Sequence, residues 1–218
     1  MRKSMCLNVV LSGIMLWGLA LSEAGASVFI NEFHYDNTGA DTLEGIEIAG
    51  PADSDLTGWR ILLYNGSNGA IYNTKILSGL IPDMQYGYGM ISFFYPSGAI
   101  QNGAPDGIAI VNPSDALVQF LSYEGSFTGL SGPANGVIST DIGISEPAST
   151  SEGYSLQLIG AGNAYSDFGW ASPMAHTFGA VNTGQTFRQG NAVPEPSSMF
   201  LLGLGMLAAV PLVRKTKK

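Results

Sequence analysis

Val28-Phe29-Ile30-Asn31-Glu32-Phe33-His34-Tyr35 decides the fold, because this run is rich in β-branched and aromatic residues and ends at the turn-forming residues Asp36-Asn37-Thr38-Gly39. Similar short runs recur at intervals of about ten to fifteen residues. Between two of them, Asn65-Gly66 is typical of a β-hairpin. The further strands that we expect cover residues 44–48, 59–64, 70–77, 86–95, 107–111, 117–123, 136–142 and 154–159.

The composition agrees with an all-β domain. The chain has 29 Gly among 218 residues and only 12% charged residues, which argues against a coiled coil or an all-helical bundle. No convincing amphipathic helix interrupts the expected strands, so alternating βαβ units are disfavoured. Residues 160–191, rich in Gly, Ser, Thr and Asn, are expected to wrap the edge of the domain. The sequence therefore predicts an antiparallel β-sandwich or barrel.

The body of the chain is strongly acidic. Residues 27–193 hold 15 of the 17 Asp and Glu residues but only three of the nine Lys and Arg residues, a formal charge of −12. Such a surface repels phosphate backbones and anionic lipid headgroups. We therefore expect no nucleic acid among its direct ligands.

The N-terminal residues have the pattern of a secretory signal peptide. Arg2 and Lys3 precede an apolar run over 7–21, and the small residues Ala24-Gly25-Ala26 follow it. We expect the secretion machinery to export the chain and a signal peptidase to cut between Ala26 and Ser27. An uncleaved N-terminal anchor is the alternative.

The C-terminal residues have three parts in a fixed order. Val193-Pro194-Glu195-Pro196 leads into the apolar span 197–213, and the basic residues 214–218 follow. The 17 residues of the span, about 25 Å of helix, reach the lower limit for crossing a bilayer. The basic end should stay in the cytoplasm and leave the acidic body outside.

This tail resembles the PEP-CTERM sorting signal of Gram-negative bacteria that make extracellular polysaccharide. The resemblance implies that a membrane protease-transpeptidase, exosortase, recognises Val193, Pro194, Glu195 and Pro196 and removes the tail. The helix would then anchor the protein in the inner membrane only transiently. The body would be periplasmic first, and afterwards cell-surface or extracellular. An ordinary C-terminal anchor is the alternative.

Short motifs of the body resemble a second family. They are Ile30-Asn31-Glu32-Phe33, Glu44-Gly45-Ile46-Glu47-Ile48, Asp55-Leu56-Thr57-Gly58-Trp59, and downstream 106–111, 120–125, 155–158, Trp170, 177–180 and 182–185.

In these motifs residues 28–187 resemble bacterial lamin-tail domains, which implies a compact immunoglobulin-like sandwich. The resemblance implies that Trp59 and Trp170 pack in the core. Strand alternation places Glu32 on the face of Ile30 and His34, so we expect it to be partly buried and hydrogen-bonded. The resemblance implies that this Glu holds the fold rather than catalyses a reaction. Gly45 departs from the family, which usually has a large apolar residue there, and this predicts a weakened second strand.

Few residues suit catalysis. Cys6 would leave with the signal peptide, so the mature chain would contain no thiol ligand and no disulfide. His34 and His176 are its only histidines, without a zinc-ligand spacing, and no Gly-x-Ser-x-Gly elbow occurs. Glu44 and Glu47, three apart in a strand, point to opposite faces. We therefore expect no enzyme.

The main alternative is a secreted hydrolase with a carboxylate- or calcium-assisted site, or an accessory binding domain for one. Its candidate residues are Glu32, Asp36, Asp41, Glu44 and Glu47. Asp36, Asp41 and Glu44 are also the candidate calcium ligands, because calcium prefers oxygen ligands. They do not form an EF-hand loop, and we expect no other cofactor.

Aromatic residues offer a candidate ligand contact. Tyr86, Tyr88 and Tyr95 lie in one expected strand, and an exposed row of tyrosines can stack on sugar rings. The alternative is that these rings pack under residues 160–191.

The sequence thus predicts a non-enzymatic surface or extracellular-matrix protein that binds polysaccharide or another protein. Its expected organisation is a signal peptide (1–26), a lamin-tail-like β-sandwich domain (27–188), a linker with the Pro-Glu-Pro motif (189–196), a transmembrane helix (197–213) and a basic cytoplasmic end (214–218).

Overall fold

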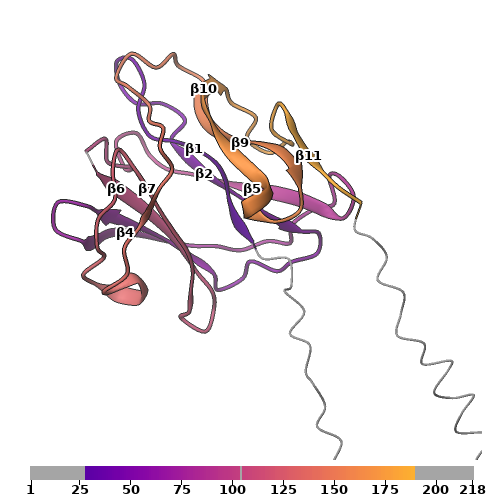
Figure 1. Ribbon diagram of the computed structural model, residues 1–218, viewed down its shortest axis with the longest axis horizontal. Helices are drawn as coiled ribbons and strands as arrows, with labels where there is room; N and C mark the ends of the chain where they lie inside the picture. Colours follow the sequence, from indigo (N-terminus) through magenta and orange to yellow (C-terminus); the bar gives the residue numbers. More distant parts are fainter. Residues whose placement is uncertain (1–27, 104, 190–218) are drawn as a thin grey trace, which may run out of the picture.

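The computed structural model describes residues 28–103 and 105–189, and the expected signal peptide, sorting motif and transmembrane helix lie outside these ranges. Two β-sheets face each other, as Figure 1 shows. Two 3-10 turns, η1 (Gly132–Ala134) and η2 (Tyr165–Asp167), are the only helical elements of the described residues. Within this part of the chain, no helix has the length and apolarity needed to cross a membrane. The predicted all-β architecture, with two packed sheets, is therefore confirmed.

The first sheet has the order β10-β9-β1-β2-β5, and β11 lies parallel to β9 outside this path. All other pairs in it are antiparallel. Its strands are β1 (Phe29–His34), β2 (Gly45–Pro51), β5 (Tyr88–Phe94), β9 (Tyr154–Gly162), β10 (Phe168–Ala175) and β11 (Gln185–Phe187).

The second sheet has the order β4-β3-β6-β7-β8, antiparallel except for the pair β7–β8. Its strands are β3 (Arg60–Asn65), β4 (Ala70–Ile76), β6 (Asp106–Val111), β7 (Leu117–Tyr123) and β8 (Thr140–Asp141).

Alternate residues of the central strands form the apolar core between the sheets. Ile46, Ile48, Ile61, Leu63 and Ile108 are among its fully buried members. The intervening residues face outward but are also covered, so each sheet has a second, smaller apolar cluster on its outer face. Trp59 and Trp170 pack against the main core as expected, each partly buried.

A β-bulge in β1 corrects the face predicted for Glu32. The register against β2 shifts between Ile30 and Glu32. Because the bulge adds one residue, Ile30 and Phe33 both point into the core, and Asn31 and Glu32 make their hydrogen bonds on the outer side. Glu32 therefore does not share a face with Ile30. Its predicted burial and hydrogen bonding are confirmed.

The expected weakness of the second strand at Gly45 is wrong. Gly45 pairs with His34 on one side and with Phe94 on the other. A Cβ at this position would lie 3.1 Å from the Phe94 ring and 3.3 Å from the Phe178 ring. Phe94 and Phe178 contact each other edge to face, so these rings fill the space of the missing side chain.

The hairpin predicted at Asn65-Gly66 is confirmed and joins β3 to β4. Its turn is longer than two residues, since the Gly69 amide donates to the Asn65 carbonyl over 2.8 Å and Gly69 has a φ of +64°. Gly66 is required for a different reason. A Cβ there would lie 2.0 Å from the Pro105 carbonyl oxygen, so only glycine permits this close approach.

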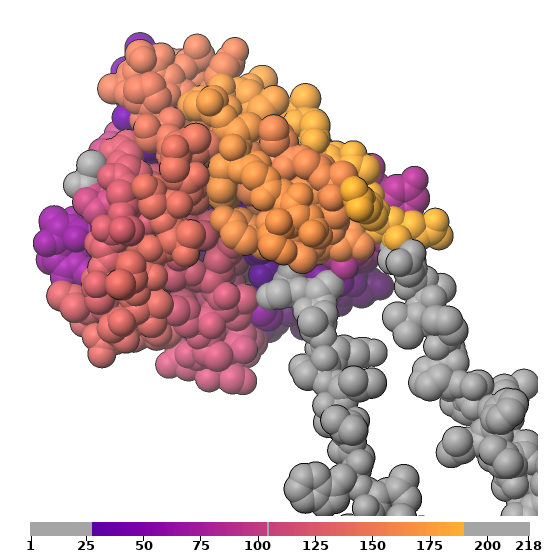
Figure 2. All heavy atoms as spheres, in the orientation of Figure 1, coloured from indigo at the N-terminus to yellow at the C-terminus, as the bar shows by residue number. Residues whose placement is uncertain are grey.

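The largest correction concerns residues 136–187. The strand expected over 136–142 shrinks to β8, whereas β9 extends to Gly162 and two unpredicted strands, β10 and β11, follow. Residues 168–187 thus contribute two strands to the first sheet rather than only wrapping the edge of the domain. In Figure 2 the orange and yellow segments accordingly form one continuous surface.

Candidate functional site

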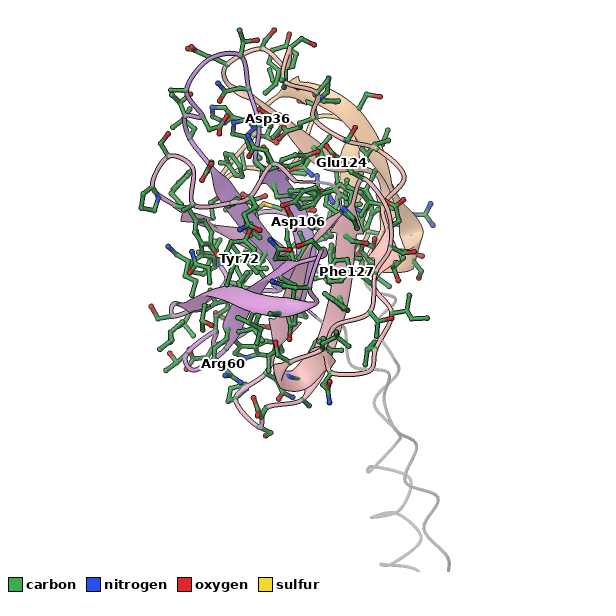
Figure 3. All side chains as sticks on the ribbon, turned by 90° about the vertical axis from the view of Figure 1, so that its left-hand side faces the viewer. Asp36, Arg60, Tyr72, Asp106, Glu124 and Phe127 are labelled. Carbon is green, nitrogen blue, oxygen red and sulfur yellow. The ribbon has the colours of Figure 1, made fainter. Side chains whose placement is uncertain are left out.

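A polar cavity of about 370 Å³ opens where the β3–β4 turn meets the start of β6. Figure 3 views the molecule from this side and labels Asp106, the first residue of β6. The cavity is lined by Asn65, Ser67, Gln101, Asn102, Gly103, Pro105 and Asp106.

Asp106 is the only ionisable residue among these and is 2% exposed. The strand register places it between Asn65 of β3 and Tyr123 of β7. Its Oδ1 accepts a hydrogen bond from the Gly66 amide over 3.0 Å, but its buried Oδ2 has no hydrogen-bond partner. Burial raises the pKa of Asp106 to about 6, and the nearby amides of Gly66 and Gly103 oppose this rise.

The amide side chains around Asp106 are held in place by other hydrogen bonds. Asn65 Nδ2 donates to Gln101 Oε1 over 2.8 Å, while Asn65 Oδ1 accepts from the Ser67 amide. The Gln101 backbone is fixed on both sides, by the hydroxyls of Tyr72 and Tyr123. The cavity is therefore a preorganised set of neutral donors and acceptors around one carboxylate.

The candidate calcium ligands bind protein groups. Glu44 is buried and accepts the backbone amides of Gly98, Ala99 and Ile100 over 2.8–3.0 Å. Asp41 accepts from the Asn37 amide and from Asn102 Nδ2. Burial, followed by the charge of Asp41, raises the pKa of Asp36. In the described residues, no group of three His, Cys, Asp or Glu side chains is arranged to hold a metal ion.

The three candidate tyrosines do not form one exposed row. Tyr86 is 58% exposed in the turn before β5, with a φ of +52°. Tyr88 stacks on Phe187 with ring centroids 5.1 Å apart. Tyr95 lies under the Lys75 ammonium, 4.4 Å from its ring centroid, and its hydroxyl is buried. Their contact with a ligand stays a prediction.

The fold brings together two carboxylates that the sequence did not pair. Glu32 and Glu47 lie opposite each other on β1 and β2, both fully buried. Residues 176–187, which we term the strap, cover them and supply Thr177 and Gly179 as hydrogen-bond donors.

Each carboxylate of this pair accepts three hydrogen bonds. Glu32 Oε1 accepts from Ser155 Oγ (2.7 Å) and the Thr177 amide (2.8 Å), and its Oε2 accepts from Thr177 Oγ1 (2.8 Å). Glu47 Oε1 accepts from Asn31 Nδ2 (3.0 Å), and its Oε2 accepts from Ser92 Oγ (2.7 Å) and the Gly179 amide (2.6 Å). The pair therefore fastens the strap to the first sheet.

His34 and Glu146 form a second buried pair of ionisable side chains. His34 Nδ1 lies 2.9 Å from Glu146 Oε1, and His34 Nε2 lies 3.1 Å from Asn37 Oδ1. Asn37 Nδ2 donates to the carbonyls of Thr38 and Ala40, so Asn37 Oδ1 is fixed as the acceptor. With Glu146 ionised, both ring nitrogens face oxygen acceptors, an arrangement that favours the charged imidazolium. Burial alone would lower the pKa of His34, but the Glu146 carboxylate raises it above the ordinary value.

These buried groups make stability depend on pH. Burial raises the pKa of Glu47 from 4.5 to about 7, and the charge of Glu32 adds to the rise. The folded protein therefore keeps a proton that the unfolded chain loses above pH 4.5, so stability falls as the pH rises toward 7. This group contributes at most about 3 kcal/mol, and the raised pKa values of His34 and Asp106 act in the same direction.

We expect the urea midpoint of the purified protein to be higher at pH 5 than at pH 8. Glu47→Gln should flatten this dependence, because the group that titrates between pH 4.5 and 7 is removed. Urea titrations at pH 5, 6, 7 and 8 compare the two proteins. An equal slope for both would contradict the role given to Glu47.

A comparison with known protein families finds a match in the C-terminal residues. Residues 192–217 match the family described as the PEP-CTERM protein-sorting motif. The chain carries a PEP-CTERM sorting motif. The predicted PEP-CTERM resemblance of the tail is thereby confirmed, and the motif implies export, transient membrane anchoring and recognition by exosortase-type sorting machinery. No curated protein and no solved structure matches the chain. The lamin-tail resemblance of the body stays a prediction.

Proposed function

We propose that this is a non-enzymatic protein of the cell surface or extracellular matrix whose lamin-tail-like, immunoglobulin-like sandwich contacts polysaccharide. The observation that carries the proposal is the sorting motif at residues 192–217, attached to a β-sandwich body. A rigid sandwich presents loops and sheet faces for binding. A sorting tail of this kind resembles those of cells that make extracellular polysaccharide.

The burial of the candidate catalytic carboxylates favours a binding function over hydrolysis. A general acid or base must reach the substrate within hydrogen-bond distance. Glu32, Glu44 and Glu47, the central residues of the hydrolase alternative, are fully buried and accept hydrogen bonds from protein donors. The same burial keeps these charges away from a polysaccharide at the surface.

The remaining surface charge favours a neutral polymer. The exposed acidic residues outnumber the three basic residues of the body, Arg60, Lys75 and Arg188. An acidic polysaccharide would be repelled by such a surface. We therefore expect neutral glycans to bind in preference to uronic-acid polymers.

A glycan array tests this function. Protein recovered after export should bind one or more neutral glycans in a saturable way, with and without calcium, and should turn over no substrate in a parallel hydrolase screen. Glu32→Gln is the control for catalysis, because Gln can retain the hydrogen bonds of Glu32 Oε1. If the wild-type protein turns over a substrate and Glu32→Gln abolishes that turnover, the proposal is contradicted. If neither glycan binding nor turnover is detected, the ligand is a protein partner instead.

A further inference from the structure

We propose that Thr177 and Gln157 form an ester bond that ties the strap covalently to β9, with Glu32 as the base and with release of one ammonia. This bond goes beyond the proposed function and does not depend on it. Three observations carry the proposal: the contacts of the Thr177 hydroxyl, a hydrogen-bonded path from Glu32 to the Gln157 nitrogen, and the burial of the reacting groups.

The Thr177 hydroxyl lies among three acceptor oxygens. Its Oγ1 is 2.8 Å from Glu32 Oε2, 3.0 Å from Gln157 Oε1 and 3.0 Å from Asn182 Oδ1. A hydroxyl has one hydrogen to donate, and an ionised carboxylate is the strongest of these acceptors. When Glu32 is ionised, the hydrogen therefore points to Glu32, and the lone pairs of Oγ1 face the two side-chain amides. A nucleophile beside its base has this arrangement.

A hydrogen-bonded path leads from Glu32 to the nitrogen that must leave. Ser155 Oγ lies 2.7 Å from Glu32 Oε1 and 3.0 Å from Gln157 Nε2. Glu32 can thus take the proton of Thr177 at Oε2 and supply a proton to Gln157 Nε2 through the Ser155 hydroxyl. Because Glu32 and Gln157 are paired across β1 and β9, the register of the sheet fixes this path.

Asn182, the other amide beside Thr177, has no such path. Its Nδ2 donates to the main-chain carbonyls of Asn31 and Leu158 over 3.1 Å and 3.0 Å. A carbonyl has no proton to give, so the Asn182 nitrogen could not leave as ammonia. The geometry therefore selects Gln157 as the partner of Thr177.

The reaction is a condensation within one chain. Thr177 Oγ1 bonds to the side-chain carbonyl carbon of Gln157 while Glu32 takes the hydroxyl proton. The C–N bond of the amide then breaks, and the nitrogen leaves as ammonia with the proton that returns through Ser155. Nothing is oxidised or reduced, and no further reactant is needed.

Burial of the reacting groups suits this reaction. Glu32, Ser155 and Gln157 are all fully buried, which keeps bulk water from competing with Thr177. Burial also raises the pKa of Glu32. A carboxyl group with a raised pKa can both take and return a proton closer to neutral pH.

The bond should form slowly, after folding. Negative charge develops on Gln157 Oε1 during the attack, and lack of one hydrogen-bond donor at such an oxygen slows acyl transfer by about 10²- to 10³-fold. Among the described residues, only the Thr177 hydroxyl lies within hydrogen-bond distance of this oxygen. Freshly exported protein is therefore in the hydrogen-bonded state, in which the stability of variants is compared, and conversion follows in the folded protein.

The position of the bond gives it a mechanical consequence. The chain continues from the strap to the sorting motif at 192–217. β9 lies between β10 and β1, and β11 at the end of the strap pairs with it (Figure 1). An ester to Gln157 would pass a pull on the C-terminal end of the domain directly to β9. Since the chain has a single cysteine, no disulfide within the chain can do the same.

Intact-mass spectrometry of the exported protein, sampled at intervals at the growth temperature, tests the bond. We expect a species lighter by the mass of one ammonia, and its share should increase with time. Chymotrypsin can cut after Tyr165, Phe168 and Trp170, which lie between the two reacting residues. The bond should therefore join two chymotryptic peptides, and hydroxylamine, which cleaves esters, should separate them.

Variants assign the roles. Thr177→Ser keeps a hydroxyl and should convert, whereas Thr177→Val should not. Glu32→Gln can keep the contacts of Oε1 but has no base, so we expect conversion to slow by about 10²-fold or more. Glu152→Ala, exposed in the turn before β9, is the control and should convert like wild type.

The wild-type protein alone can overturn the proposal, if its mass stays unchanged throughout. A lighter species in Thr177→Val would also overturn it. The same holds for a loss of ammonia that maps to Asn182, or to an Asn-Gly sequence such as 135–136, where a succinimide gives the same change in mass. None of these measurements involves a glycan, so failure of the ester bond leaves the proposed function unaffected.

Discussion

Glu32→Ala will lower the free energy of unfolding by about 3 kcal/mol or more, a large part of the total for a domain of this size. The substitution removes the acceptor of three hydrogen bonds and leaves the O–H of buried Ser155 and the Thr177 amide without an acceptor, although Ser155 Oγ still accepts from Gln157 Nε2. Because the Thr177 amide belongs to the strap, we expect amide hydrogen exchange to increase in the strap first.

Glutamine substitutions separate loss of the charge from loss of the hydrogen bonds. In Glu32→Gln, Oε1 can still accept from Ser155 and from the Thr177 amide. The Thr177 hydroxyl can turn to Gln157 Oε1 or Asn182 Oδ1, each 3.0 Å away. We expect this variant to lose less than about 1 kcal/mol.

Glu47→Gln should be more harmful than Glu32→Gln. Both oxygens of Glu47 accept from N–H donors, Asn31 Nδ2 on one side and the Gly179 amide on the other. Either orientation of a glutamine amide therefore places two donors against each other, at a cost of about 1–3 kcal/mol.

Urea unfolding at pH 7 measures all three variants, with the exposed Glu152→Ala as the matched control. The expected order of stability is control, Glu32→Gln, Glu47→Gln, Glu32→Ala. Equal losses for Glu32→Gln and Glu32→Ala would show that charge, and not the hydrogen-bond pattern, holds the strap.

The central strands could be predicted from the sequence because their signals are local. The run at 28–35 and the turn at Asn65-Gly66 each carry their information within a few residues. β10 was missed because Gly169, Ser172 and Pro173 dilute its apolar residues, and its pairing with β9 stabilises it instead. Tertiary context decides such strands more than their intrinsic propensity does.

The buried carboxylate pair could not be predicted, since it depends on register. Glu32 and Glu47 are opposite each other only because the bulge after Ile30 shifts the pairing. In the sequence, the nearer pair was Glu44 and Glu47, which the fold sends to different partners. A single extra residue in one strand thus redirects the side-chain contacts of the whole sheet face.

The polar cavity was missed for a related reason. Asn65 and Asp106 are paired across β3 and β6, although 41 positions separate them in the sequence. Asn65-Gly66 is interpreted from the sequence only as a turn, and Asp106 only as the first residue of the lamin-tail-like motif at 106–111, before the strand expected at 107–111. Gln101-Asn102-Gly103 carries no distinguishing signal, because Asn and Gly are typical of any connection between strands.

Pro194→Ala combined with Glu195→Ala will stop maturation and accumulate the uncut protein in the inner membrane. Both residues lie within the matched motif at 192–217 but outside the apolar span, so membrane insertion should be unchanged. Processing depends instead on recognition of the motif, in which one carboxylate stands between two prolines. Pulse-chase labelling with membrane fractionation measures the ratio of uncut to mature protein.

Gly190→Ala with Asn191→Ala is the matched control, because these positions precede the matched motif and carry no part of it. The control should mature at the wild-type rate, while the motif variant should be almost entirely uncut. Normal maturation of the motif variant would reduce the tail to an ordinary anchor. A motif variant absent from the membrane fraction would instead assign Pro194 and Glu195 to insertion. A motif variant that is inserted in the membrane but remains uncut would show that recognition by the processing enzyme and membrane anchoring depend on different residues of the same tail.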